Sequence, residues 1–310
     1  MVYVVPPGWR RRVFGRFLSA VWCGHPSRPR GCGLRHRLRL ETLESRSLLS
    51  VAVMVADFKD SQDRWVSPGF TDVNGMLYFA VDDGPHGREL WRSDGTTEGT
   101  KLVKDFNLTS GSYLQNLTNV NGTLYLRAFD GTDTEPWKCI GVDAVEIDIN
   151  KSGSSFPSGL TNVNGTLYFS ANDGEYELWK YDGATPTKIN VAAIGSSYPD
   201  QLTDVNGTLY FSARDGQHGV YTQLFRCADT TVTTIPLVDG ATRADPLYLT
   251  NVNGTLYTWV HYSLDGANYS WGLYRVDGTT ATRIAVNPGT NWSPTSGMVG
   301  SGTTLYFPLY

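Results

Sequence analysis

Long apolar runs and charged side chains are both scarce in this chain of 310 residues. No stretch approaches the roughly 18 consecutive apolar residues that a membrane-spanning helix needs, so we expect no transmembrane span. Charged residues make up 18% of the sequence, aromatic residues make up 12%, and 33 residues are glycine. This composition is typical of a β protein with many tight turns, and it argues against a coiled coil or a disordered chain.

Motifs that carry known chemistry are also missing. The sequence has no HExxH segment, no GxSxG segment and no GxxxxGKS/T segment, so it indicates neither a zinc protease, nor an α/β-hydrolase, nor a phosphate-binding loop. Its four cysteines form no CxxC pair, which argues against a zinc site. From the sequence we therefore assign no catalytic, cofactor-binding or metal-binding residues, and we expect no cofactor.

The net charge of −4 is unevenly distributed. Residues 1–50 hold ten arginines, no lysine and only two acids, Glu41 and Glu44, whereas the rest of the chain holds 16 basic and 28 acidic residues. Opposite charge in two sections indicates two separate segments. We expect residues 1–50 to form a disordered, Arg-rich export or targeting segment. The acidic remainder argues against nucleic acid as a partner.

A repeated phrase dominates the rest of the chain. Leu117-Thr-Asn-Val-Asn-Gly-Thr-Leu-Tyr125 recurs nearly unchanged from Leu160, Leu202 and Leu249. The leucine of its Leu-Tyr pair falls at positions 77, 124, 167, 209, 256 and 305, which gives a period of 42 to 49 residues. A period in this range is the signature of a repeat architecture in which each repeat is one supersecondary unit.

Each unit reads as four short strands. The Asn-Gly pair after the first strand predicts a two-residue hairpin, because both central residues of a type I′ turn need a positive φ. The apolar run that follows, clearest in Leu167–Ala171, predicts a second strand buried on both faces. Four strands per repeat predict an all-β fold, a β-propeller of four-stranded blades over residues 51–310. We expect six blades, the last one incomplete, and a solenoid of stacked β units is the alternative.

Two segments resemble known families. Glu89-Leu-Trp-Arg-Ser-Asp-Gly-Thr96 matches the ELWxxDGT repeat in full, and Glu177-Leu-Trp-Lys-Tyr-Asp-Gly183 matches all but its last residue. Leu43-Glu-Ser-Arg-Ser-Leu-Leu49 resembles the LEPR-XLL motif, with Ser45 where proline is usual. These resemblances imply a large secreted or surface protein of bacteria, with no established catalytic role for the repeat, and an extracellular or cell-surface location.

Two histidines are candidate site residues. His86 and His218 occupy equivalent Asp-Gly-x-His-Gly loops, where a metal or catalytic role is imaginable. A turn residue inherited with the repeat is the interpretation we prefer.

Paired aspartates in these loops are candidate Ca²⁺ ligands. The two best clusters are Asp82 with Asp83, and Asp130 with Asp133. Ca²⁺ takes six to eight oxygen ligands, which neither pair provides. Because Asp before Gly is common turn chemistry, we prefer a turn role for these residues as well.

Two positions repeat in the third strand of every unit. The first is aromatic, and we predict core packing between blades rather than a sugar-stacking surface at Trp91, Trp137, Trp179, Phe225 and Tyr274. The next is cationic, and we predict pairing with a glutamate of a neighbouring blade rather than a ring that binds an anionic polymer at Arg92, Lys138, Lys180, Arg226 and Arg275. Cys139 and Cys227 should be free thiols, because an intervening blade separates them.

These observations favour a secreted or cell-surface, non-catalytic scaffold or binding propeller, with an extracellular polysaccharide or a surface protein as its partner. The alternative is a carbohydrate-active enzyme, a polysaccharide lyase or hydrolase, that uses the propeller channel. Such an enzyme would need converging acids or histidines, and the irregular stretches Asp130–Glu135 and His261–Trp271 are where we would expect them. A degenerate or truncated reading frame is a third interpretation.

Overall fold

The computed structural model describes residues 2–4, 53–56, 69–83, 87–284, 294 and 297–308. The chain divides into two compact units, Met1–Asp57 and Phe58–Tyr310. In the first unit, β1 (Val2–Val4) pairs antiparallel with β2 (Val53–Ala56). Within the described ranges no helix is long and apolar enough to cross a membrane.

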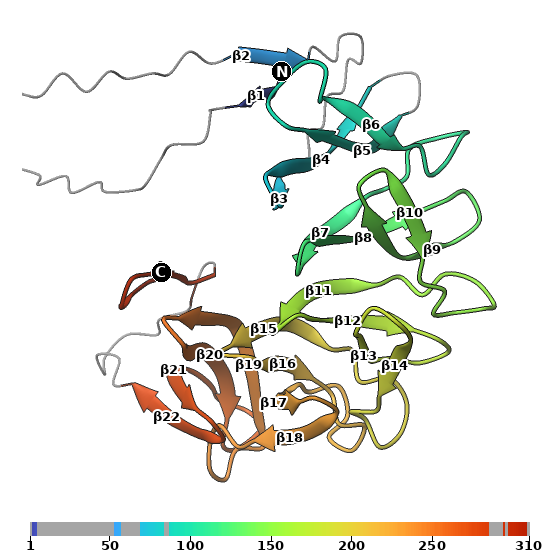
Figure 1. Ribbon diagram of the computed structural model, residues 1–310. Coiled ribbons are helices and arrows are strands. Elements are labelled where there is room, and N and C mark those ends of the chain that lie inside the picture. Colours follow the sequence, from blue (N-terminus) through green and yellow to red (C-terminus); the bar gives the residue numbers. More distant parts are fainter. Residues whose placement is uncertain are drawn as a thin grey trace, which may run out of the picture. The chain divides into compact units, whose positions relative to one another are not determined.

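In the described part of the second unit there are five four-stranded antiparallel sheets, each with its strands in chain order (Figure 1). Blade one consists of β3 (Thr71–Val73), β4 (Met76–Asp82), β5 (Arg88–Ser93) and β6 (Lys101–Lys104). Blade two consists of β7 (Gln115–Val120), β8 (Thr123–Phe129), β9 (Thr134–Ile140) and β10 (Asp143–Glu146). Blade three consists of β11 (Ser158–Val163), β12 (Thr166–Asn172), β13 (Tyr176–Tyr181) and β14 (Pro186–Ile189).

Blade four consists of β15 (Asp200–Val205), β16 (Thr208–Ala213), β17 (Gln223–Ala228) and β18 (Thr231–Ile235). Blade five consists of β19 (Arg243–Val252), β20 (Thr255–Ser263), β21 (Tyr269–Asp277) and β22 (Thr280–Ile284). A two-stranded hairpin follows, β23 (Val299–Ser301) with β24 (Thr304–Tyr306), which we call hairpin six. The prediction of four-stranded blades with an incomplete last one is confirmed.

The Asn-Gly hairpins form as the sequence predicts. In blade two, Asn121 has φ 49° and Gly122 has φ 81°, the positive values that a type I′ turn requires. Asn119 closes the turn, because its Oδ1 accepts a hydrogen bond from Gly122 N at 2.9 Å. The same closing bond, from Asp or Asn to the turn glycine, recurs in all five blades, at Gly75, Gly122, Gly165, Gly207 and Gly254.

The repeated phrase also joins neighbouring blades. Thr118 Oγ1 donates to Leu160 O of the next blade at 3.1 Å, and Asn162 Nδ2 donates back to Asn119 O at 3.1 Å. The threonine bond recurs between each pair of successive blades from one to five. The polar residues of the phrase therefore form hydrogen bonds between blades as well as within the turn.

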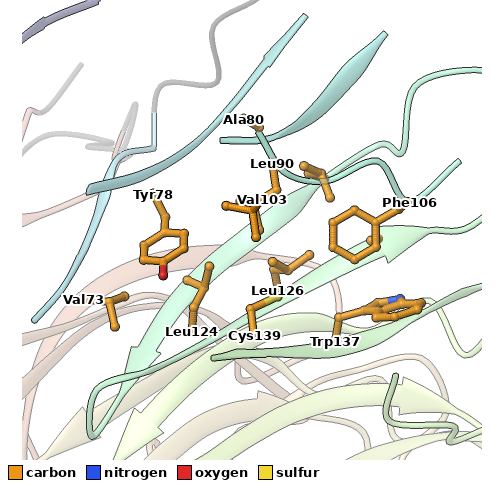
Figure 2. Packing of buried hydrophobic residues seen from close by; sticks show 12 residues of the cluster. Val73, Tyr78, Ala80, Leu90, Val103, Phe106, Leu124, Leu126, Trp137 and Cys139 are labelled. Carbon is orange, nitrogen blue, oxygen red and sulfur yellow. The ribbon is translucent and has the colours of Figure 1, made fainter. Parts of the chain in front are cut away.

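The core lies between the blades (Figure 2). Tyr78, Leu90 and Phe106 of blade one pack against the second and third strands of blade two, including Leu126 and Trp137. Phe106 meets the Trp137 ring edge-on at 5.0 Å between centroids. Equivalent clusters fill the spaces between the later blades and between blade five and hairpin six.

Four of the five aromatic residues of the third-strand series belong to hydrophobic cores of this kind. Trp137, Trp179, Phe225 and Tyr274 are 6%, 8%, 3% and 5% exposed, and Trp91 is half-buried. The prediction of core packing rather than a sugar-stacking surface is therefore confirmed for these four residues. Cys139 and Cys227 are also buried in the cores, and both are free.

Each blade has two distinct ends because its strands alternate in direction. The turns between first and second strands, and between third and fourth strands, lie at one end, which we call the turn end. The loops between second and third strands, and the connections from one blade to the next, lie at the other, the loop end.

Candidate functional site

Three connections between blades present an exposed aromatic residue at the loop end. Tyr113, Phe156 and Tyr198 lie two residues before the first strands of blades two, three and four, and are 65%, 44% and 46% exposed. Their φ angles are 48°, 47° and 48°, in the left-handed region that bulky side chains avoid. Such strain costs on the order of 1–3 kcal/mol per residue, so the surroundings must hold each residue in place. We call these three residues the connection aromatics.

A buried serine precedes each connection aromatic and anchors it to the preceding blade. Ser155 is fully buried, and its Oγ donates to Glu135 Oε2 of blade two at 2.5 Å. Glu135 is itself fully buried and accepts two backbone bonds, from Ile149 N at 3.2 Å and from Ser155 N at 2.7 Å. Equivalent bonds join Ser112 to Glu89 and Ser197 to Glu177.

Backbone hydrogen bonds fix the same turn from both sides. Ser155 O accepts a bond from Asn172 N, at the end of the second strand of its own blade, at 2.9 Å. Phe156 N donates to Thr134 O of the preceding blade at 3.1 Å. Blades two and four repeat the first bond, from Phe129 N to Ser112 O and from Arg214 N to Ser197 O. Each aromatic is thus held in its strained conformation by two blades together.

The buried glutamates of these clamps resist ionisation. Burial raises the pKa of Glu89 and of Glu135 to about 7, although the serine hydroxyls and backbone N–H groups oppose this rise. Burial also raises the pKa of Glu177. The three carboxyl groups therefore serve as hydrogen-bond partners inside the protein and are not available at the surface.

The predicted pairing of these glutamates with cations is wrong. The glutamate lies at the loop end of the third strand, where it accepts a hydrogen bond from the serine of the next connection. The cation stands three residues later in the strand and therefore lies near the turn end. There, Lys138 Nζ donates to Gly183 O of the next blade at 3.4 Å, and Lys180 Nζ pairs with the carboxylate of Asp229. These two lysines do link blades, but through the hairpin turn of the neighbouring blade.

Aromatic and arginine side chains surround the connection aromatics. The Arg214 guanidinium lies 4.7 Å from the centroid of the Tyr198 ring, and Tyr176 stacks on Tyr198 with centroids 5.2 Å apart. The Arg127 guanidinium lies 5.7 Å from the Phe156 ring. In blade two, the Tyr113 and Phe129 rings lie 6.2 Å apart. The loop end therefore carries flat, partly exposed rings next to cations.

Blades four and five build a different cluster at the loop end. Arg243 lies 4.7 Å from the Tyr221 ring and 5.5 Å from the Tyr269 ring, and it pairs with the carboxylate of Asp245. The His261 ring stacks on the Tyr269 ring with centroids 4.9 Å apart, and it lies tilted against the Trp271 ring with centroids 4.5 Å apart. Burial, together with the charge of Arg243, lowers the pKa of His261 and so favours its neutral form.

A pocket of about 210 Å³ opens beside this cluster. Tyr221, Arg243, His218 and Gln223 contribute polar groups to its wall, and the remaining wall is mostly aliphatic. A pocket of this volume is smaller than the usual site for a drug-sized ligand, so it would take a small molecule or one end of a larger one.

The histidine and aspartate candidates from the sequence form hydrogen bonds within their own loops. His218 Nδ1 lies 2.5 Å from Asp215 Oδ2. Burial would raise the pKa of Asp215, but hydrogen bonds from His218 N and Gln217 N hold it at about 2. Asp130 Oδ1 accepts bonds from Thr132 N and Asp133 N, as a turn residue does.

The other candidates add no metal site within the described residues. His86 lies outside them, and Asp83 N closes its own loop by donating to Gly87 O at 3.1 Å. In the part of the chain that the structure describes, no three His, Cys, Asp or Glu side chains are placed to hold a metal ion.

The sequence does hold a signal for the connection aromatics. A serine stands five residues before the leucine of the repeated phrase, and an aromatic residue stands four before it, at Ser112-Tyr113, Ser155-Phe156 and Ser197-Tyr198. The pair was missed because it lies in connections whose other residues differ.

No protein-family model matches the chain, and no curated protein matches it. Among solved structures, a prolyl endopeptidase has a TM-score of 0.50 and 12% sequence identity over 76% of this chain, which spans only 37% of that protein. The β-propeller domain of the Trilobed protease from Pyrococcus furiosus has a TM-score of 0.47 and 12% identity, over 76% of this chain and 72% of that one. An ulvan lyase has a TM-score of 0.40 and 8% identity, over 80% and 79% of the two chains. The fold of the second unit is a β-propeller.

Proposed function

We propose that this protein is an exported, non-catalytic binding propeller that holds an extracellular polysaccharide at the loop end of its blades. The observation that carries the proposal is the threefold repetition of a strained, exposed aromatic residue at Tyr113, Phe156 and Tyr198. Exposed rings add little to a hydrophobic core, and backbone strain clusters at ligand-binding sites. A ligand that contacts the rings explains why three blades share this arrangement.

The chemistry of the loop end suits a chain of sugars. Aromatic rings are flat and rigid, and they offer apolar faces against which the C–H side of a sugar can lie. Arg214 beside Tyr198 and Arg127 beside Phe156 add donors for hydroxyl or carboxylate groups. Equivalent positions on successive blades suit a polymer with repeating units better than a single small molecule.

The proposed lack of catalysis rests on where the acidic groups lie. Glu89, Glu135 and Glu177 are buried and occupied by serine and backbone donors. The two irregular stretches named as candidate catalytic sites are likewise engaged, Asp130 with its own turn and His261 between two aromatic rings. Export is supported by the resemblance of Leu43–Leu49 to LEPR-XLL and of Glu89–Thr96 to ELWxxDGT.

The test is a glycan array probed with the full chain, followed by titration of the best ligand. We expect binding to one class of polysaccharide, weakened at least tenfold by Tyr113→Ala combined with Tyr198→Ala. Tyr306→Ala is the matched control, because Tyr306 is 58% exposed but belongs to hairpin six. Undiminished binding by the double variant, with the fold intact by circular dichroism, would refute the proposal.

Two other outcomes would redirect it. Capture of a surface protein that the same double variant no longer binds would make the loop end a protein interface. Release of new reducing ends from a bound polysaccharide would establish the carbohydrate-active enzyme instead.

A further inference from the structure

The turn end of the propeller has its own pattern of contacts between blades. The tyrosine of the Leu-Tyr pair donates its hydroxyl to the third-to-fourth-strand turn of the next blade: Tyr78 to Gly141 O at 3.2 Å, Tyr168 to Asp229 O at 2.9 Å, and Tyr210 to Gly278 O at 3.1 Å. The cation of the third strand approaches the same turn. Between blades three and four, Lys180 of the cationic series meets the carboxylate of Asp229 there.

The contact between blades four and five lacks this carboxylate. Gly278 occupies the turn position that Asp229 holds in blade four, as the two tyrosine bonds show. Arg226, the cation that corresponds to Lys180, forms no ion pair with any described residue. A half-buried guanidinium therefore faces a position from which its counter-charge is missing.

A pocket of about 230 Å³ lies at this position. Arg226 of blade four and Arg275 of blade five both line it, together with Thr208, Thr255 and Asp277. Among the described residues of the wall, Asp277 is the only acid. It lies 3.7 Å from Arg275 in a pair in which the side chains of Arg275 and Asp277 are 54% and 84% exposed. Exposed pairs of this kind are weak, so Arg275 can leave Asp277 for another anion, and the two arginines outnumber the single acid in the described wall.

We propose that this pocket, the seam pocket, binds an oxyanion: a carboxylate, sulfate or phosphate group, free or carried by a larger ligand. A guanidinium presents a planar fork of N–H donors that matches two oxygens of such a group. Arg226 and Arg275 supply two of these forks from neighbouring blades, and the hydroxyls of Thr208 and Thr255 add neutral donors. The bound group takes the place that the Asp229 carboxylate fills one blade earlier.

The seam pocket is independent of the proposed polysaccharide surface. It lies at the turn end, whereas Tyr113, Phe156 and Tyr198 lie at the loop end of the blades. Loss of one activity without the other would therefore distinguish the two proposals.

The test measures thermal unfolding of the full chain against increasing sodium sulfate in the low-millimolar range, with the ionic strength held constant by sodium chloride. We expect the midpoint to rise with the logarithm of the sulfate concentration, by about 2–4 °C once sulfate exceeds its dissociation constant about tenfold. Arg226→Gln and Arg275→Gln should each abolish the rise. Lys180→Gln is the matched control and should keep it, because Lys180 already has Asp229.

A second arm separates the sources of the oxyanion. Sodium glucuronate is compared with glucose in the same assay, so that a carboxylate on a sugar is tested against the same sugar without charge. If the unfolding midpoint rises with sulfate or with glucuronate, and the rise depends on Arg226, the site is supported. The probe that causes the rise then identifies the kind of oxyanion that the pocket binds. No rise of the midpoint with either probe, or an equal rise in Arg226→Gln, would overturn it.

Discussion

The first three contacts between successive blades at the loop end differ from the fourth in the direction of one hydrogen bond. In each of the three contacts from blade one to blade four, the acid stands on the third strand of the earlier blade. The hydroxyl stands on the connection that follows, as in Glu135 and Ser155. Between blades four and five, Asp245 in the first strand of blade five accepts bonds from Thr222 N at 3.0 Å and Thr222 Oγ1 at 3.2 Å. Thr222 stands just before the third strand of blade four. A carboxylate bonded to a hydroxyl is kept, while the two residues exchange sides.

The exchange coincides with the loss of the exposed aromatic residue. Asp245 stands four residues before Leu249, the position that Tyr198 holds before Leu202. Asp245 is buried and, unlike Tyr198, has no positive φ. The strained aromatic thus occurs together with the serine clamp in three connections. Where the clamp is reversed, the loop end is built from Tyr221, Arg243 and Tyr269 instead.

The largest effect should come from the feature that both kinds of contact share, the packed third-strand aromatic. We expect Trp179→Ala to lower the free energy of unfolding by about 3–5 kcal/mol, the usual cost of removing a buried tryptophan. Denaturant titration measures it. A change below about 1 kcal/mol would mean that the clamps, rather than the core, hold the blades together.

The next largest effect should separate the two kinds of contact. Glu135→Ala leaves the Ser155 hydroxyl and Ile149 N–H without their buried partner, so we expect a loss of about 3 kcal/mol. Gln223→Ala, at the equivalent position of blade four, removes bonds within a partly exposed loop and should cost less than about 1 kcal/mol. Equal losses would contradict the distinction.

The pH dependence of stability should also differ between the two kinds of contact. Because burial raises the pKa of Glu89 and Glu135 from 4.5 to about 7, the folded protein binds protons more tightly than the unfolded chain between these values. Their contribution to stability should therefore increase as the pH falls from about 8 to about 5. The measurement is denaturant unfolding across this range, compared with Glu89→Gln combined with Glu135→Gln, which should flatten the curve. An unchanged curve would mean that these carboxyl groups ionise normally.

The smallest effect concerns the strain itself. Tyr113 is 65% exposed, so Tyr113→Gly loses little packing and removes the steric cost of φ 48°. We expect the free energy of unfolding to rise by about 0.5–1 kcal/mol, while polysaccharide binding weakens. A clear loss of stability would instead show that the ring supports the fold.

The sequence predicted the blades well because their strands are specified by local patterns. Asn-Gly turns and continuous apolar runs such as Leu167–Ala171 depend on residues that are adjacent in the chain. The clamps were not predicted, because Glu135 and Ser155 lie 20 residues apart and meet across two blades. The alternation of side chains along a strand assigns Glu135 to one face of its sheet. It does not predict which residue of the next connection contacts that face.

The connection aromatics were not predicted from the sequence for a related reason. The aromatics that repeat most visibly in the sequence are those of the third strand, and Trp137 and Trp179 are buried in the cores between blades. The exposed rings of Tyr113 and Phe156 stand in connections of differing sequence, where a pattern search has the least to compare. Their left-handed backbone, which distinguishes them, is a property of the folded protein.

The serine clamp gives the chain a polarity that bears on how such a protein can grow. Blade two carries Ser112 for the glutamate behind it and Glu135 for the serine ahead of it, and blade three carries Ser155 and Glu177 in the same order. If a segment that begins at such a serine and includes the following glutamate were duplicated, the new serine would meet the glutamate of the blade before it. The new glutamate would likewise meet the serine of the blade after it. Blade five carries Asp245 near the start of its first strand and would place this acid against the glutamate of blade one, two or three if it followed one of them. Lengthening by tandem duplication is therefore compatible with the early blades, whereas a copy of blade five placed behind one of them would not match.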